Sequence, residues 1–220
     1  MKQLSDQIRQ KKYRNTLDNQ DNRFRNLLSE ADWLQLPETV QKRFSKVVKG
    51  GESTVYAGEI TQMRKSIWGA GLGQFLRLLG APLPLRSDVG TPSIVSVTED
   101  GATGGQIWTR LYANKSGFPQ IVQSAKRFSG PTGLEEYLGF GVSMRLRARV
   151  DGDCLAFESA GYALKCLGIV LPLPRCVVPL DLIVRHKDLA EGKFIFTLDL
   201  THPWLGELIH QKGVYREDTS

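Results

Sequence analysis

The stretch GVSMRLRARVDGDCLAFESA, residues 141–160, decides the fold class of this chain. In its first half, apolar side chains alternate with serine and arginine, so that three arginines share one face and the apolar side chains share the other. A period of two is typical of a β-strand with one buried face. The Asp-Gly pair at 151–152 is a common tight-turn sequence, and residues 153–160 then return as a second strand. The stretch therefore predicts an antiparallel hairpin.

Similar runs recur along most of the chain beyond residue 50. They cover residues 52–62, 94–98, 106–112, 118–128, 176–186, 193–200 and 209–216. Polar, glycine-containing loops separate several of these runs, which is typical of antiparallel sheets. We predict an α+β fold that is mainly antiparallel β, with about eight or nine strands in a curved sheet or a partly closed β-barrel.

Residues 66–80, SIWGAGLGQFLRLLG, predict a covering helix directly after the first strand. Trp68 and Leu72 fall on one side of this helix together with later apolar residues, so we expect that side to be buried. GAGLG resembles part of a dinucleotide-binding fingerprint, but no alternating strand–helix series follows it. Glycines that let the helix pack closely against the sheet are the favoured interpretation. A membrane-interface helix is the alternative, and it is disfavoured because such helices carry a richly basic polar face.

The net charge of +6 is concentrated near the N-terminus. Residues 1–26 carry seven Lys or Arg and three Asp, whereas the remainder is nearly balanced, with 22 basic and 20 acidic residues. We predict a polar basic tail over residues 1–23, a single domain over 24–216 that begins with a short helical lead-in, and a short tail over 217–220. Because the chain shows no recognisable nucleic-acid motif, we expect no nucleic-acid partner.

Cysteine and histidine usage gives no support for disulfides or metals. Cys154, Cys166 and Cys176 are an odd number without a close CxxC pair, and the three histidines form no closely spaced pair. We therefore expect no disulfide framework, no metal site and no cofactor. The first residues lack the apolar core of a signal peptide, and prolines and charges interrupt the longest apolar stretch. These features indicate a soluble, cytoplasmic protein without a transmembrane segment.

The candidate ligand-binding residues lie in QIWTRLY, residues 106–112, and in EEYLG, residues 135–139. Trp108, Arg110 and Tyr112 share one face of the predicted strand, where they could stack on a ligand; cross-strand packing is the favoured alternative. Glu136 could form a structural ion pair with an arginine or act as a general acid or base, and the structural interpretation leads. No catalytic residue is predicted, because no nucleophile motif occurs in a suitable context.

Two similar segments predict apolar corners of the fold. LGAPLPLR, residues 79–86, is nearly repeated by LGIVLPLPR, residues 167–175. Leucines alternate there with prolines, which lack a backbone donor and favour extended, strand-ending conformations. We predict that both segments either pack against the sheet or rim its mouth, where a pocket entrance would lie. The candidate rim residues are Leu83, Pro84, Leu171, Pro172 and Leu173.

Several motifs become recognisable when taken together. They are GEIT (58–61), LGAPLP (79–84), WTR (108–110), EEYLG (135–139), LGIVLPLPR (167–175) and FTLDLTHPWLGELI (196–209). In this order and spacing they resemble the bacterial domain-of-unknown-function 4166 family, over about residues 24–216. The matching positions are Trp108, Arg110, Glu136, Pro172, Pro174, Pro203 and Gly206. HQKG (210–213) departs from the family pattern, which usually has a Tyr-Arg-Gly-like sequence there.

The resemblance implies no settled activity and no role for any matching residue. Members of the family occur alone or behind an NAD(P)-binding dehydrogenase-like domain, which implies such a protein as a candidate partner.

Three functions are carried forward from the sequence. The first is a non-enzymatic binding module for an apolar or lipid-like small molecule, or for an anionic amphipathic one, with Arg110 and Glu136 at one end of the pocket. The second is an interaction or regulatory domain that partners a dehydrogenase-like protein. The third is an enzyme built around Arg110 and Glu136. It requires these two side chains to converge in an accessible cleft.

Overall fold

The computed structural model describes residues 20–78, 89–176 and 178–217. Its helical segments are η1 (Arg25–Leu27), α2 (Glu30–Gln35), α3 (Glu38–Phe44) and α4 (Ile67–Leu78). Its strands are β1 (Ser53–Lys65), β2 (Thr91–Asp100), β3 (Gly105–Tyr112), β4 (Gln120–Arg127), β5 (Glu135–Gly139), β6 (Val142–Asp151), β7 (Cys154–Cys166), β8 (Ile169–Leu173), β9 (Asp181–Asp188), β10 (Lys193–His202) and β11 (Gly206–Glu217).

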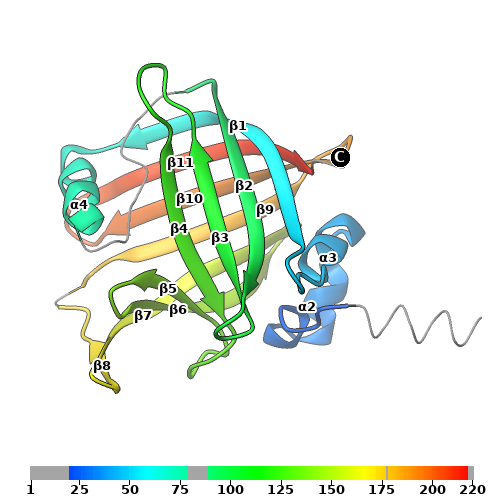
Figure 1. The fold of residues 1–220 in the computed structure, drawn as a ribbon, viewed down its shortest axis with the longest axis horizontal. Coiled ribbons are helices and arrows are strands. Elements are labelled where there is room, and N and C mark those ends of the chain that lie inside the picture. Colours follow the sequence, from blue (N-terminus) through cyan, green and yellow to red (C-terminus); the bar gives the residue numbers. More distant parts are fainter. Residues whose placement is uncertain (1–19, 79–88, 177, 218–220) are drawn as a thin grey trace, which may run out of the picture.

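Ten of the eleven strands in these residues form a closed antiparallel barrel (Figure 1). Neighbours in the barrel are mostly consecutive in the chain, so the sheet is a meander from β1 to β11. The barrel closes because the last strand, β11, pairs with the first, β1. β8 stands outside this ring and pairs only with the second half of β7. The predicted antiparallel barrel is confirmed in a fully closed form.

The predicted count of eight or nine strands is too low, because two short strands were not assigned. β5 has only five residues, too few for a clear alternation. β8 has the sequence IVLPL, and its proline argues against a strand within a sheet. Pro172 pairs with Ala163 of β7, and β8 is the edge strand of the sheet, which is where proline is tolerated in strands.

Alternation places one face of each strand in the core. In β2, Ser93, Val95 and Val97 are buried, while the intervening Ile94 is exposed. In β6, Met144 and Leu146 are buried, and the three arginines of this strand, Arg145, Arg147 and Arg149, lie on the outer face. The period-two interpretation of residues 141–150 is therefore confirmed.

The N-terminal helices close one end of the barrel, which we call the helix-capped end. α2 and α3 place Trp33, Val40 and Phe44 in the main apolar core. Phe24 packs edge-on against Phe44 and Phe128, with ring centroids 5.2 Å and 4.9 Å away. The predicted helical lead-in is confirmed. Most of the predicted tail lies outside the described residues.

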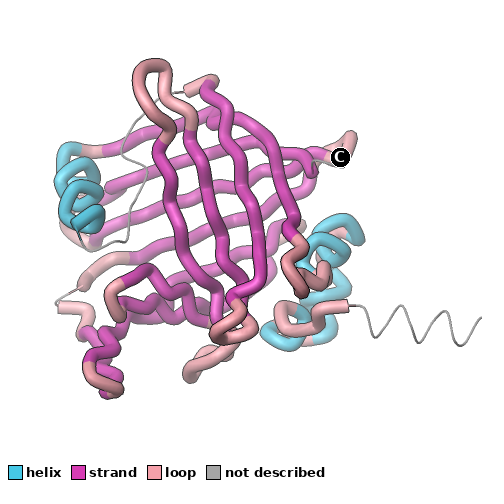
Figure 2. The backbone as a smooth tube through the Cα atoms, viewed as in Figure 1, coloured by secondary structure: helices cyan, strands magenta, loops and turns pink. Residues whose placement is uncertain are grey.

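α4 lies on the opposite side of the barrel, at what we call the α4 end (Figure 2). Gly69 faces β11 so closely that a Cβ there would clash with the carbonyl of Leu208, which confirms the predicted close packing at this glycine, whereas Gly71 has open space around it. The buried side predicted for this helix is only partly found, because Leu72 packs against the core whereas Trp68 is 63% exposed. The physical reason is position, since a helix at a barrel end is covered only toward the strand it touches. No helix among the described residues is long and apolar enough to cross a membrane.

Candidate functional site

β3 directs its even-numbered residues into the barrel. Trp108 is buried, and Arg110 and Tyr112 follow it toward the α4 end with partial exposure. The sequence predicted that these three side chains share a face, and the structure places that face inside the barrel. Glu136 joins them from β5, with its carboxylate 3.5 Å from the Arg110 guanidinium.

Glu136 is the centre of a buried charged cluster. Its Oε1 accepts a hydrogen bond from Ser124 Oγ at 2.6 Å, and its Oε2 accepts one from Lys126 Nζ at 3.0 Å. Arg110 also donates to Ser124 Oγ at 3.1 Å, so this serine bridges Arg110 and Glu136. Lys126 lies between aromatic rings, 5.1 Å from the centroid of Trp108. Two cations thus share one carboxylate in a region largely closed to water.

The pKa of Glu136 shows that the carboxylate is held ionised. Burial acts to raise this pKa, but the charges of Lys126 and Arg110 and the hydrogen bonds from Ser124 and Lys126 outweigh burial and lower it to about 2. Burial lowers the pKa of Lys126, and Glu136 partly offsets that effect. A carboxylate saturated by these donors is suited to an ion pair and poorly suited to proton transfer near neutral pH.

A cavity of about 60 Å³ lies beside this cluster, inside the barrel. It is lined by Phe44, Val95, Trp108, Arg110, Tyr112, Lys126, Phe157, Val184, Phe196, Thr197, Leu198, Gln211, Gly213 and Tyr215. Besides the two tyrosines, the ionisable residues in this lining are Arg110 and Lys126, and both are cations. Burial raises the pKa of Tyr112, so its hydroxyl stays protonated and can donate; it lies 3.5 Å from Gln211 Oε1. One wall is therefore cationic and hydrogen-bonding, and the other is aromatic and aliphatic.

The predicted site residues have different positions relative to this cavity. Trp108, Arg110 and Tyr112 line it, whereas Glu136 is not among the lining residues and instead holds Arg110 and Lys126. The predicted rim residues on β8 do not line it: Leu171 and Pro172 are exposed, and Leu173 packs against the apolar core. Leu83 and Pro84 lie outside the described residues.

Sequence reasoning missed several members of the site. Nothing in the sequence marks Lys126 as a site residue, because a lysine in a strand is usually solvated. Only the tertiary structure buries this one. Ser124 has the same parity as Lys126 in β4 and shares its inward face. Gln211 and Tyr215 belong to β11, whose position beside β1 follows from barrel closure.

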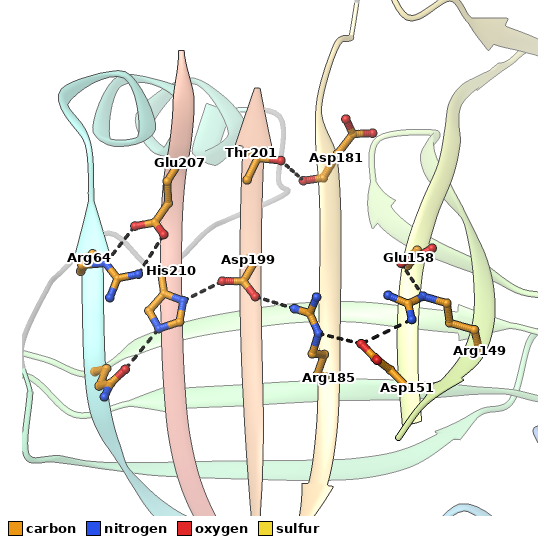
Figure 3. A network of polar contacts seen from close by, with 11 residues as sticks. Arg64, Arg149, Asp151, Glu158, Asp181, Arg185, Asp199, Thr201, Glu207 and His210 are labelled. Carbon is orange, nitrogen blue, oxygen red and sulfur yellow. Dashed lines mark hydrogen bonds and ion pairs between the residues drawn. The ribbon is translucent and has the colours of Figure 1, made fainter. Parts of the chain in front are cut away.

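A second polar network runs across the outer wall of the barrel (Figure 3). Asp199 on β10 accepts from Arg185 of β9 at 2.7 Å, and its other oxygen lies 2.6 Å from His210 Nδ1 of β11. Arg64 of β1 binds Glu207 through two contacts of 2.9 Å. Such cross-strand pairs stabilise neighbouring strands by modest amounts each.

Asp199, Glu207 and His210 bring three metal-ligand atoms within 4.8 Å of one another. However, Arg185 and Arg64 already bind the two carboxylates, so a cation would have to displace both guanidinium groups. The contacts favour a structural ion-pair network over a metal site at these three residues.

His186 lies in the aromatic core near the helix-capped end. It is fully buried and stacks on Phe194 at 4.9 Å, while Arg43 of α3 lies 3.1 Å from its Nε2. Burial and, after it, the charge of Arg43 lower the pKa of His186 well below its usual value. The folded protein therefore keeps this imidazole neutral.

We expect acid to destabilise the protein through His186. Its folded pKa is depressed, so below about pH 6.5 the unfolded chain binds a proton that the folded protein does not. The free energy of unfolding should then fall by up to about 1.4 kcal/mol per pH unit from this residue. Urea unfolding between about pH 7 and pH 5 measures the slope, and His186→Leu should make it shallower. An unchanged slope in the variant would assign the pH dependence to other groups.

Comparison with known families identifies the chain. A family model described as "Domain of unknown function (DUF4166)" matches residues 36–215, which is most of the chain and nearly all of the barrel. The chain belongs to this family. The resemblance inferred from the ordered motifs is thereby confirmed, and the DUF4166 barrel is the structural unit that holds the cavity.

Other comparisons add little to the DUF4166 assignment. A search of curated proteins finds no match. Among solved structures, a crystal structure of a mutant of the fluorescent protein UnaG matches with 14% sequence identity and a TM-score of 0.30, covering 76% of this chain and 95% of that chain. None of these matches concerns a dehydrogenase-like partner, which stays a prediction.

Proposed function

We propose that the barrel interior binds a small amphipathic anion, with the anionic group at Arg110 and Tyr112 and the apolar part against Phe196 and Leu198. This is the binding-module hypothesis narrowed to one ligand chemistry. Arg110 suits the purpose because a guanidinium binds a carboxylate, phosphate or sulfonate with two parallel hydrogen bonds.

The imbalance of charge around the cavity carries the proposal. Glu136 balances one of the two cations beside it, so one positive charge remains on Arg110 and Lys126 together. Buried charges in proteins are normally paired, because leaving one uncompensated in an apolar environment is costly. An anion in the cavity would supply the missing partner, and the tyrosine hydroxyl and Gln211 amide beside it would supply further hydrogen bonds.

The cavity volume limits the size of the ligand. About 60 Å³ corresponds to the space of roughly two water molecules. This is enough for an anionic head group, whereas a longer apolar chain requires Phe196 and Leu198 to move. The geometry therefore supports a compact ligand better than a long acyl chain.

Hexanoate and its neutral isostere hexanamide test the proposal. We expect the protein to bind hexanoate about tenfold or more tightly than hexanamide, since a hydrogen bond to a charged group contributes about 1.5–3 kcal/mol. Arg110→Gln should abolish this preference and leave the weak binding of hexanamide unchanged. NMR titration of both ligands measures the two affinities.

Arg147→Gln is the matched control, because Arg147 is exposed on the outer face of β6. It should leave the preference for hexanoate intact. Equal affinity for the two ligands in the unmodified protein, or a preference that survives Arg110→Gln, would refute a head-group site at Arg110. A series from butanoate to dodecanoate then shows where added chain length stops improving affinity.

A further inference from the structure

The two ends of the barrel carry different connections. In an antiparallel meander, successive turns alternate between the ends, so α4 and the turns 113–119, 140–141 and 203–205 share one end with the β8 hairpin. Backbone contacts agree, since the amide of Ser66 before α4 bonds the carbonyl of Leu208 just after the β10–β11 turn, and Lys165 beside the β8 hairpin bonds Gly141. Figure 1 shows α4 and β8 projecting from the same side of the barrel.

Exposed apolar side chains gather at this α4 end. Of the fourteen large apolar residues that are exposed among the described residues, ten lie in these connections. The most prominent are Trp68, Phe118, Phe140, Leu167, Leu171 and Trp204. Leu167 is 98% exposed and Trp204 is 83% exposed. Leu34 is the only one of the fourteen on the helices of the opposite end.

Charge divides the two ends in the same way. The α4-end segments 66–71, 113–119, 139–141, 166–176 and 203–205 contain no Asp or Glu. Lys115 and Lys165 are exposed there, and the nearby acidic groups Asp181 and Glu207 are each paired with an arginine. At the helix-capped end the turns do contain or adjoin acidic residues, among them Asp100, Asp153 and Glu191, although each of these is also paired with a cation.

We infer that the α4 end docks onto an anionic lipid surface. Exposed apolar patches of this kind on a folded protein mark interaction sites. A bilayer interface accommodates tryptophan, phenylalanine and leucine on separate loop tips without a matching contour, and anionic head groups attract the lysines. A protein partner would instead need a surface shaped to several separate projections.

The docking surface lies next to the candidate ligand site. Tyr112 is the last residue of β3 and therefore sits at the α4 end of the interior. A ligand exchanged with a bilayer would pass through this end. The docking itself does not depend on the interior site, so the two proposals can fail separately.

Vesicle co-sedimentation tests the docking. The full chain should bind vesicles of phosphatidylcholine with 30% phosphatidylserine about tenfold more strongly than pure phosphatidylcholine vesicles, and high salt should weaken the binding. The double variant Trp204→Ser/Leu205→Ser should lower the partition coefficient at least about tenfold. Leu34→Ser is the control, since it removes an exposed leucine from the other end of the barrel and should leave vesicle binding unchanged.

Tryptophan fluorescence gives an independent readout. Trp33 and Trp108 are buried, whereas Trp68 and Trp204 are exposed at the docking end. Binding should shift the emission to shorter wavelength and make it quenchable by brominated lipids. Trp68→Phe/Trp204→Phe keeps the apolar surface, so it should still bind vesicles but lose the spectral shift.

Several results would overturn the inference. The first is that the protein does not bind the anionic vesicles. The second is that the Trp204→Ser/Leu205→Ser variant binds them as well as the unmodified protein. The third is that sedimentation velocity shows self-association which this variant abolishes. Arg110→Gln should leave vesicle binding unchanged, and Trp204→Ser/Leu205→Ser should leave hexanoate binding unchanged. A failure of the docking is thereby separated from a failure of the interior site.

Discussion

Replacing Glu136 with leucine is expected to lower the free energy of unfolding by about 3–5 kcal/mol, because it leaves Lys126 and Arg110 without their shared counter-charge. Lys126 is the decisive group, since it is buried and Glu136 is its only partner in an ion pair among the described residues. Removing one member of a buried pair strands the other in an environment that cannot solvate it.

The double variant Glu136→Leu/Lys126→Met isolates this effect. Removing both charges leaves an apolar pair of similar volume, so most of the lost stability should return. Urea unfolding of the unmodified protein, the two single variants and the double variant gives the coupling between the two residues. A coupling near zero would show that water screens the pair, which would also undermine the charge imbalance on which the ligand proposal rests.

Replacing Phe194 with alanine is expected to cost a similar amount, about 3–5 kcal/mol. Phe194 is fully buried at the centre of the aromatic cluster, with ring centroids 5.2 Å from Tyr56 and 4.9 Å from His186. The guanidinium of Arg43 lies 4.0 Å from its ring centroid. The substitution therefore opens a cavity and removes the ring that Arg43 covers.

Two further substitutions put the loss of stability from Phe194→Ala in proportion. Phe194→Leu keeps most of the volume and should cost well under half as much. Phe140→Ala removes the same atoms from an exposed turn and should change stability by about 0.5 kcal/mol or less. Thermal or urea unfolding measures all three variants. A small loss for Phe194→Ala would mean that the surrounding side chains collapse into the space, and the core would then be less rigid than its packing indicates.

Local pattern was sufficient for most of the strands. Residues 141–160 form β6, its turn and the start of β7, because alternation and an Asp-Gly pair are properties of neighbouring residues. The turn uses Gly152 with φ at +63°, a conformation that glycine adopts readily. β8 and β5 were missed because their status as strands depends on the partner they pair with.

The candidate site was half visible in the sequence. Alternation alone placed Trp108, Arg110 and Tyr112 on one face, and it could not tell whether that face points inward or outward. Trp68 shows the converse, since helical periodicity predicted a buried position where the end of the barrel leaves the side chain exposed. The two faces of a strand become an inner and an outer face only when the sheet closes into a barrel.

The sequence by itself determined most of the strands and their antiparallel character, the helical lead-in and the family, because these follow from short-range periodicity and from ordered motifs. Only the tertiary structure decided the closure of β1 on β11, the burial of Lys126 beside Glu136 and the gathering of apolar tips at one end. The reason is physical. Pairing between the first and last strands joins residues about 150 positions apart, and its free energy comes from burying the whole interior at once rather than from any local segment.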